Sequence, residues 1–85
     1  MQWRIDIHID EYDTVTRAEV RLHNPDETRL VGVGTSRCHP HDVGVPKIGD
    51  ELAVARALAD LARQLRDATS VDIEAITHEQ VHLNA

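Results

Sequence analysis

"QWRIDIHID", residues 2–10, alternates strictly between apolar and polar side chains. The apolar positions are Trp3, Ile5, Ile7 and Ile9, and the residues between them are charged or imidazole-bearing. This period of two is typical of a strand with one buried face. The alternation returns in "TVTRAEVRLH", residues 14–23, with Ala18, Val20 and Leu22 at the apolar positions. Because only the short polar link "EYD" separates the two segments, they predict an antiparallel hairpin.

A third strand is predicted in "RLVGVGTSRC", residues 29–38, after the turn-forming segment "NPDET". Val31 and Val33 share one face of this strand, and Gly32 and Gly34 share the other. Two glycines on one face leave a shallow strip that another backbone or side chain can approach closely, or they mark a bulge. The three segments together predict a three-stranded antiparallel meander.

One long helix is predicted in "ELAVARALADLARQLRDA", residues 51–68, which is rich in Ala, Leu and Arg and contains no Gly or Pro. Asp50 is the predicted N-cap or an early acidic residue of the first turn. The next segment, "SVDIEAIT", favours a short second helix over continuation, with Ser70 as its N-cap and Glu74 reaching back to it. The fold class is therefore α+β, in the order β-β-β-α-α, as a single domain over residues 1–85.

The predicted loop at residues 38–49 separates the third strand from the long helix. We interpret it, with the start of the helix, as a structural clasp. In this clasp the prolines restrict the chain, Asp42 caps backbone amides, and Gly49 supplies an unusual backbone angle or a close approach. The clasp residues are Pro40, Asp42, Pro46, Gly49 and Asp50.

The same loop offers a competing hypothesis, a zinc site. Cys38, His39, His41 and Asp42 are ligand types that zinc accepts, and His78 and His82 could complete the set. A lone Cys-His-x-His is nevertheless a weak signature, because zinc sites usually show two spaced pairs. A Cys38 nucleophile would need a base within about 3 Å and a third group to orient that base. We therefore favour a polar loop and predict no catalytic residue, no metal and no cofactor.

The overall charge limits the classes of partner. Fifteen acidic residues against nine basic ones give a net charge of −6, which disfavours general binding to DNA or RNA phosphates. Neither an apolar run of about 18 residues nor a signal-peptide pattern is present, so we predict a cytoplasmic protein that binds no membrane. A local basic patch remains a hypothesis: Arg4, Arg17, Arg21 and Arg37 could gather on the outer sheet face and contact ribosomal RNA or another protein.

The apolar face of the long helix is too wide for one sheet. Its apolar residues cover roughly 200° of the helix circumference, whereas a helix on a sheet needs a stripe of little more than 100°. An 85-residue chain also buries only about 60% of the surface that its unfolded form exposes. The excess apolar face must meet the predicted second helix, another subunit or both. A homodimer is the simplest use, with these interface candidates: Val54, Leu58, Leu61, Leu65 and Ala68.

The segments "VGVG", "PHDVGVPKIGDELAVARALADLARQL" and "SVDIEA" resemble a small family of uncharacterised actinobacterial proteins, over nearly the whole chain. The resemblance implies a fold similar to double-stranded-RNA-binding domains, a homodimer without attached catalytic activity, and a link to stress or dormancy. It also implies a shape comparable with ribosome-hibernation factors. Against RNA binding, the helix begins with Asp50 and Glu51, where RNA-binding domains present lysines to phosphates.

Overall fold

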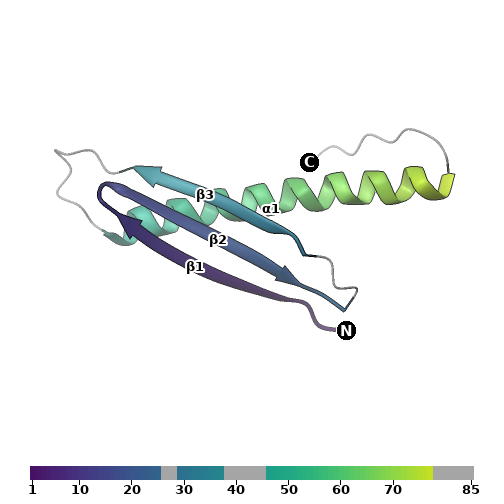
Figure 1. The fold of residues 1–85 in the computed structure, drawn as a ribbon, viewed down its shortest axis with the longest axis horizontal. Helices are drawn as coiled ribbons and strands as arrows, with labels where there is room; N and C mark the ends of the chain where they lie inside the picture. The colour runs from purple at the N-terminus through teal and green to yellow at the C-terminus, as the bar shows by residue number, and fades with distance from the viewer. Residues whose placement is uncertain (26–28, 38–45, 78–85) are drawn as a thin grey trace.

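The structure, a computed structural model, describes residues 1–25, 29–37 and 46–77. Three strands, β1 (Arg4–Tyr12), β2 (Val15–His23) and β3 (Val31–Arg37), precede one helix, α1 (Pro46–Thr77). The strands pair antiparallel in the order β1-β2-β3, and α1 lies beside β3 with β1 on the far side (Figure 1). The predicted α+β fold with a three-stranded meander followed by a long helix is confirmed.

The helix departs from the prediction at both ends. It begins at Pro46 and has no acidic residue in its first turn, so both predictions for Asp50, as N-cap and as first-turn acid, are wrong. The acidic helix start used as an argument against RNA binding is therefore wrong as well. It then continues unbroken for 32 residues to Thr77, so the short second helix does not exist. The Ser70 hydroxyl donates to the carbonyl oxygen of Arg66, 3.2 Å away, instead of capping a new helix. A serine can bond back to the preceding turn in this way, and no Gly or Pro after Gly49 interrupts the helix.

The core is a narrow seam between β2 and the sheet-facing stripe of α1. Its fully buried members are Ala18, Val20 and Leu22 of β2, and Ala53, Ala57 and Leu61 of α1. The helical residues are spaced by four, so they lie above one another on one face. Most of the wide apolar face predicted for the helix therefore remains outside this core.

Glycines set the distance between helix and sheet. A Cβ at Gly34 would overlap the carbonyl oxygen of Ala53 and the backbone nitrogen of Ala57, and one at Gly32 would overlap the carbonyl oxygen of Ala57. The helix backbone thus rests directly on the backbone of β3. The predicted close approach to these glycines is confirmed, with the helix backbone as the neighbour, whereas the alternative of a bulge is wrong because β3 keeps an unbroken register with β2. Val31 and Val33 consequently face outward, where 38% and 37% of their surface is exposed.

Polar side chains of α1 cover the free edge of β3. The backbone nitrogen of Val33 donates to Oδ2 of Asp60 at 2.9 Å. Nη1 of Arg56 donates to the carbonyl oxygen of Thr35, and Nε2 of Gln64 donates to that of Val31, both at 2.7 Å. Arg56, Asp60 and Gln64 follow at intervals of four and form one row along the helix. The edge of β3 is therefore closed to further strand pairing.

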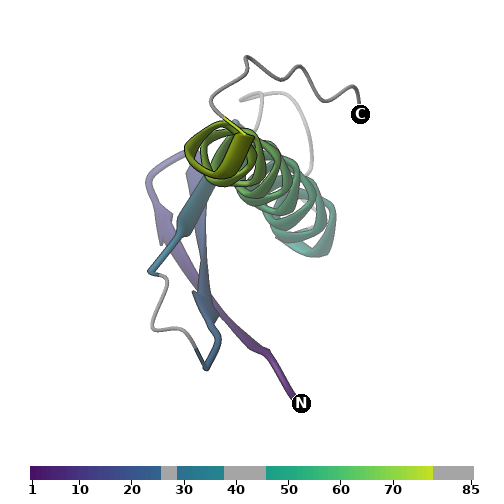
Figure 2. The ribbon, with the colours of Figure 1, turned by 90° about the vertical axis from the view of Figure 1, so that its right-hand side faces the viewer.

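Among the described residues, β1 at the far edge of the sheet is left almost uncovered by the helix. Seen along the helix, α1 lies over β3 and β2 and hardly meets β1 (Figure 2). The radius of gyration is 16.2 Å. A compact domain of this length would have about 12 Å. The fold is elongated, and every residue of β1 is exposed.

Candidate binding surface

The helix-facing side of β1 carries an apolar row that no element within residues 1–25, 29–37 and 46–77 covers. Ile5, Ile7 and Ile9 keep 44%, 49% and 39% of their surface exposed, and Trp3 keeps 50%. Strand alternation places these residues on the same face as the buried Ala18, Val20 and Leu22 of β2. The alternation in the sequence therefore predicted the strand correctly, but the helix does not reach far enough to bury its apolar side. A row of this kind marks a surface that meets a partner.

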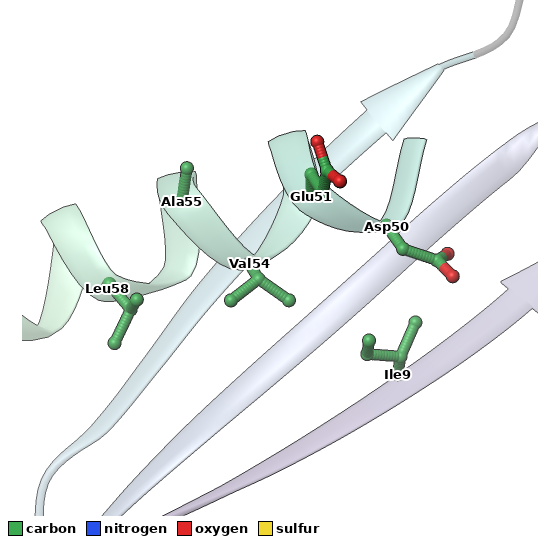
Figure 3. Close-up of a pocket in the computed structure, with 6 residues that line it drawn as sticks. All are labelled: Ile9, Asp50, Glu51, Val54, Ala55 and Leu58. Carbon is green, nitrogen blue, oxygen red and sulfur yellow. The ribbon is translucent and has the colours of Figure 1, made fainter. Parts of the chain in front are cut away.

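A groove lies between the Ile9 end of this row and α1. It has a volume of about 390 Å³ and is lined by six residues: Ile9, Asp50, Glu51, Val54, Ala55 and Leu58. Val54 and Leu58 point from the helix toward Ile9 (Figure 3). Leu58 is 40% exposed although it directly follows the buried Ala57 in the helix. The groove is thus the region where the surplus apolar face of α1 and the apolar face of β1 converge.

Carboxyl groups form the rim at one end of the groove. The hydrogen bond to Asp50 and the negative charge of that residue raise the pKa of the Glu11 carboxyl, with burial adding to the effect. Oδ1 of Asp50 is buried and has no hydrogen-bond partner among the described residues. Glu51 also lines the groove, within ion-pair distance of Lys47 at 3.8 Å. This rim repels phosphate and suits an apolar or cationic partner.

The predicted dimer-interface residues divide between groove and core. Val54 and Leu58 line the groove, as a partner-binding role requires. Leu61 is only 2% exposed and belongs to the core, so its prediction as an interface residue is wrong. Leu65 packs against the same core, and Ala68 is half-buried. The helical periodicity could not show which of these residues would face the core and which the groove, because both sides of the stripe are equally apolar.

The outer sheet face carries the predicted arginines together with carboxylates. Arg17 and Arg21 both bind Glu19, at 2.7 and 3.1 Å. These hydrogen bonds hold the pKa of Glu19 below its ordinary value. Arg4 binds Asp6 at 3.2 Å, and Asp6 also contacts His23 of β2 at 2.8 Å. Arg37 ends β3 opposite Val15. The face is therefore a mosaic of both charges and not a basic patch.

Several residues of the clasp and zinc hypotheses lie outside the described residues: Cys38, His39, Pro40, His41, Asp42, His78 and His82. Of the others, Pro46 begins α1. The carbonyl oxygen of Gly49 accepts a 2.7 Å hydrogen bond from the buried Ser36 hydroxyl. Gly49 has no positive φ, and a Cβ there would make ordinary contacts, so its predicted special angle or close approach is wrong. Within residues 1–25, 29–37 and 46–77, no three His, Cys, Asp or Glu side chains could share a metal ion.

The family model named Rv2632c-like matches residues 1–82 of the chain. The chain belongs to the Rv2632c-like family. Uncharacterized protein Mb1767 of Mycobacterium bovis is 51% identical over 81 residues, covering 95% of this chain and 85% of that protein. Uncharacterized protein Rv2632c of Mycobacterium tuberculosis is 54% identical over 78 residues, covering 92% and 83%.

The solved structure most useful for comparison is the crystal structure of Rv2632c. It superimposes with a TM-score of 0.84 at 52% identity, and the match covers 93% of each chain. The meander-plus-helix fold is thus shared within the family. In the described part of the chain, no helix is long and apolar enough to cross a membrane.

The closed edge of β3 was missed in the sequence. Arg56, Asp60 and Gln64 lie on the polar side of the helix, outside the apolar face from which the fold was predicted. The sequence did contain an indication of this contact. Polar residues spaced by four form a row beside the apolar stripe, and such a row must lie along the border of the surface that the stripe covers. The sequence did not say which strand that margin would meet.

Proposed function

We propose that this protein is a non-enzymatic binding module that acts as a homodimer. The observation that carries the proposal is the uncovered apolar row of Ile5, Ile7 and Ile9 beside the groove-lining residues of α1. A small chain with such a thin core gains stability from each apolar side chain that a partner removes from water, at about 25 cal/mol per Å². A second copy of the same chain is a partner that is available wherever the protein itself is present.

Ribosome or structured-RNA binding through the arginine-bearing face stays a prediction. The carboxylates that bind Arg4, Arg17 and Arg21 would have to be displaced, or would repel the phosphates that approach those arginines. A stress or dormancy role, and the likeness to double-stranded-RNA-binding domains, rest on the family resemblance alone. Zinc binding gains no support from the described residues.

Light scattering during size-exclusion chromatography tests the proposal. We expect twice the 9.5 kDa chain mass at micromolar concentration. Ile7→Lys should shift the equilibrium toward monomer, because it places a charge in the apolar row. Ile76→Lys is the matched control, since Ile76 is 79% exposed near the end of α1 and far from the row. A single 9.5 kDa species at high micromolar concentration would contradict the homodimer.

A further inference from the structure

The backbone of β1 presents an unpaired edge. In an antiparallel sheet, the N–H and C=O groups of every second residue point to the same neighbouring strand. The backbone nitrogen of Leu22 donates to the carbonyl oxygen of Leu30 at 3.0 Å, so the even-numbered residues of β2 bond toward β3. The odd-numbered residues of β2 therefore bond β1, and their register partners there are even-numbered. The N–H and C=O groups of Ile5, Ile7 and Ile9 consequently point away from the sheet.

This edge carries charged side chains on its outer face, but it lacks the other devices that normally prevent strand addition. Edge strands are usually short, interrupted by Pro or a bulge, or covered by another element. β1 has nine residues in unbroken register with β2, contains neither Pro nor Gly, and is not covered by α1. The edge of β3, in contrast, is closed by Arg56, Asp60 and Gln64. Only an extended strand can satisfy alternating donors and acceptors of this kind.

We propose that the strand added at this edge is β1 of a second copy, antiparallel and related by a two-fold axis at Ile7. Ile7 then faces its own counterpart, and Ile5 faces Ile9 of the other chain. These odd-numbered residues form the hydrogen-bonded pairs, in agreement with the direction of their backbone groups. The inference rests on the proposed homodimer and specifies its interface. The product is one six-stranded sheet with an isologous contact.

The charges on the outer face match this register. With the axis at Ile7, Arg4 stands opposite Asp10 of the other copy, and Asp6 stands opposite His8. Each pairing occurs twice, so all four outer residues of this stretch meet an opposite or complementary group. An axis at Ile9 would place Asp6 opposite Tyr12, and an axis at Ile5 would leave Asp10 beyond the overlap. An axis at His8 would pair the whole strand from Arg4 to Tyr12, but it would set Asp6 opposite Asp10, two like charges. Of these axes, the one at Ile7 is therefore the one that pairs every outer residue from Arg4 to Asp10 with an opposite or complementary group.

The same arrangement joins the two apolar rows. The isoleucines of both copies lie on the helix side of the shared sheet and form one continuous strip across the axis. The two α1 helices stand on that same face, at either side of the strip. The interface therefore places the exposed apolar surface of β1 next to its own counterpart, where each row shields the other.

Engineered disulfides test the register. Outer-face residues form the non-hydrogen-bonded pairs, whose Cα atoms are about 4.5 Å apart, within the range for a disulfide. In a Cys38→Ser background, the double variant Asp6→Cys/His8→Cys should oxidise to a covalent dimer. The matched control Arg4→Cys/His8→Cys shifts one partner by two residues, which puts the sulfurs out of reach. We expect cross-linking at least about tenfold faster in the first variant.

A charge reversal supplies a second measurement. Arg4→Asp should weaken the dimer about tenfold, because two attractive pairs across the axis become repulsive. Arg66→Asp makes the same change in net charge on α1 and should leave the dissociation constant within about threefold. A dimer in solution that cross-links equally in both cysteine variants, or in neither, overturns this interface but leaves the homodimer standing. A monomer overturns both proposals.

Discussion

Replacing Gly34 by alanine should separate the helix from the sheet. The added methyl group would overlap the carbonyl oxygen of Ala53 and the backbone nitrogen of Ala57, and would lie 2.8 Å from the carbonyl carbon of Arg56. All three atoms belong to the helix backbone, so no side-chain rotation can relieve the overlap. Carbon atoms in contact prefer about 3.5–4.0 Å, so α1 must retreat by about 1 Å.

The cost can be estimated from the bonds that bridge α1 and β3. The hydrogen bonds from Val33 to Asp60, from Arg56 to Thr35 and from Gln64 to Val31 measure 2.9, 2.7 and 2.7 Å. A retreat of about 1 Å lengthens each beyond hydrogen-bonding distance, and overpacking of this kind costs about 1–3 kcal/mol before such losses are added. We expect Gly34→Ala to lower the free energy of unfolding by about 3 kcal/mol or more, a large share of the total for a small domain.

Urea unfolding followed by circular dichroism measures this difference. Gly49→Ala is the matched control, because a methyl group there would lie 3.4 Å from Oγ1 of Thr16 and 3.5 Å from the Ser36 hydroxyl, which are ordinary contacts. Alanine is the better helix former, so this control should stabilise the protein by about 0.5–1 kcal/mol. The two substitutions are chemically identical and opposite in predicted sign. If Gly34→Ala unfolds within about 0.5 kcal/mol of the natural protein, direct backbone contact between α1 and β3 is refuted.

Three further substitutions probe separate parts of the fold. The hydrogen bond from Val33 and the contacts with Arg63 lower the pKa of Asp60, so the charged form of Asp60 stabilises the fold. This contribution is lost as the pH falls through the lowered pKa. Asp60→Asn should flatten this acid limb in urea midpoints measured against pH, and an unchanged limb would contradict the role given to Asp60. Glu11 has a raised pKa beside Asp50, so its ionisation opposes folding as the pH rises through that pKa. Glu11→Gln should therefore raise the melting temperature at neutral pH but not at low pH. A lower melting temperature at neutral pH would contradict repulsion between the two carboxylates. Ser70→Ala should stabilise the protein by up to about 0.5 kcal/mol in thermal melts, because alanine is the better residue inside a helix, whereas loss of a true N-cap would cost about 1 kcal/mol.

The sequence by itself determined the strands and their faces. Alternation at Trp3, Ile5, Ile7 and Ile9 located β1, because a side chain on a strand must point to one face or the other whatever the strand contacts. The paired glycines of β3 likewise indicated a place for close approach or a bulge, since this depends only on the missing Cβ, but which neighbour would approach was left open. The family resemblance was also carried by the sequence, through the segment that leads into α1.

The ends of the helix were decided by structure beyond the local sequence. Asp50 and Ser70 are good capping residues, yet both lie within α1. Capping preferences amount to about 1 kcal/mol, and continuing a helix adds a backbone hydrogen bond for each residue fixed. Local signals of this size predict where a helix can begin but do not fix where it does.

Only the tertiary structure decided which apolar residues would be buried. Ile7 and Val20 follow the same alternation and are register partners, yet Val20 is fully buried and Ile7 is 49% exposed. The difference arises because one helix covers β3 and β2 and stops short of β1, a choice set by the glycine strip of β3 and the polar row of α1. A pattern in the sequence shows which side of a strand is apolar, but the position of the helix determines how much of that side meets protein and how much is left for a partner.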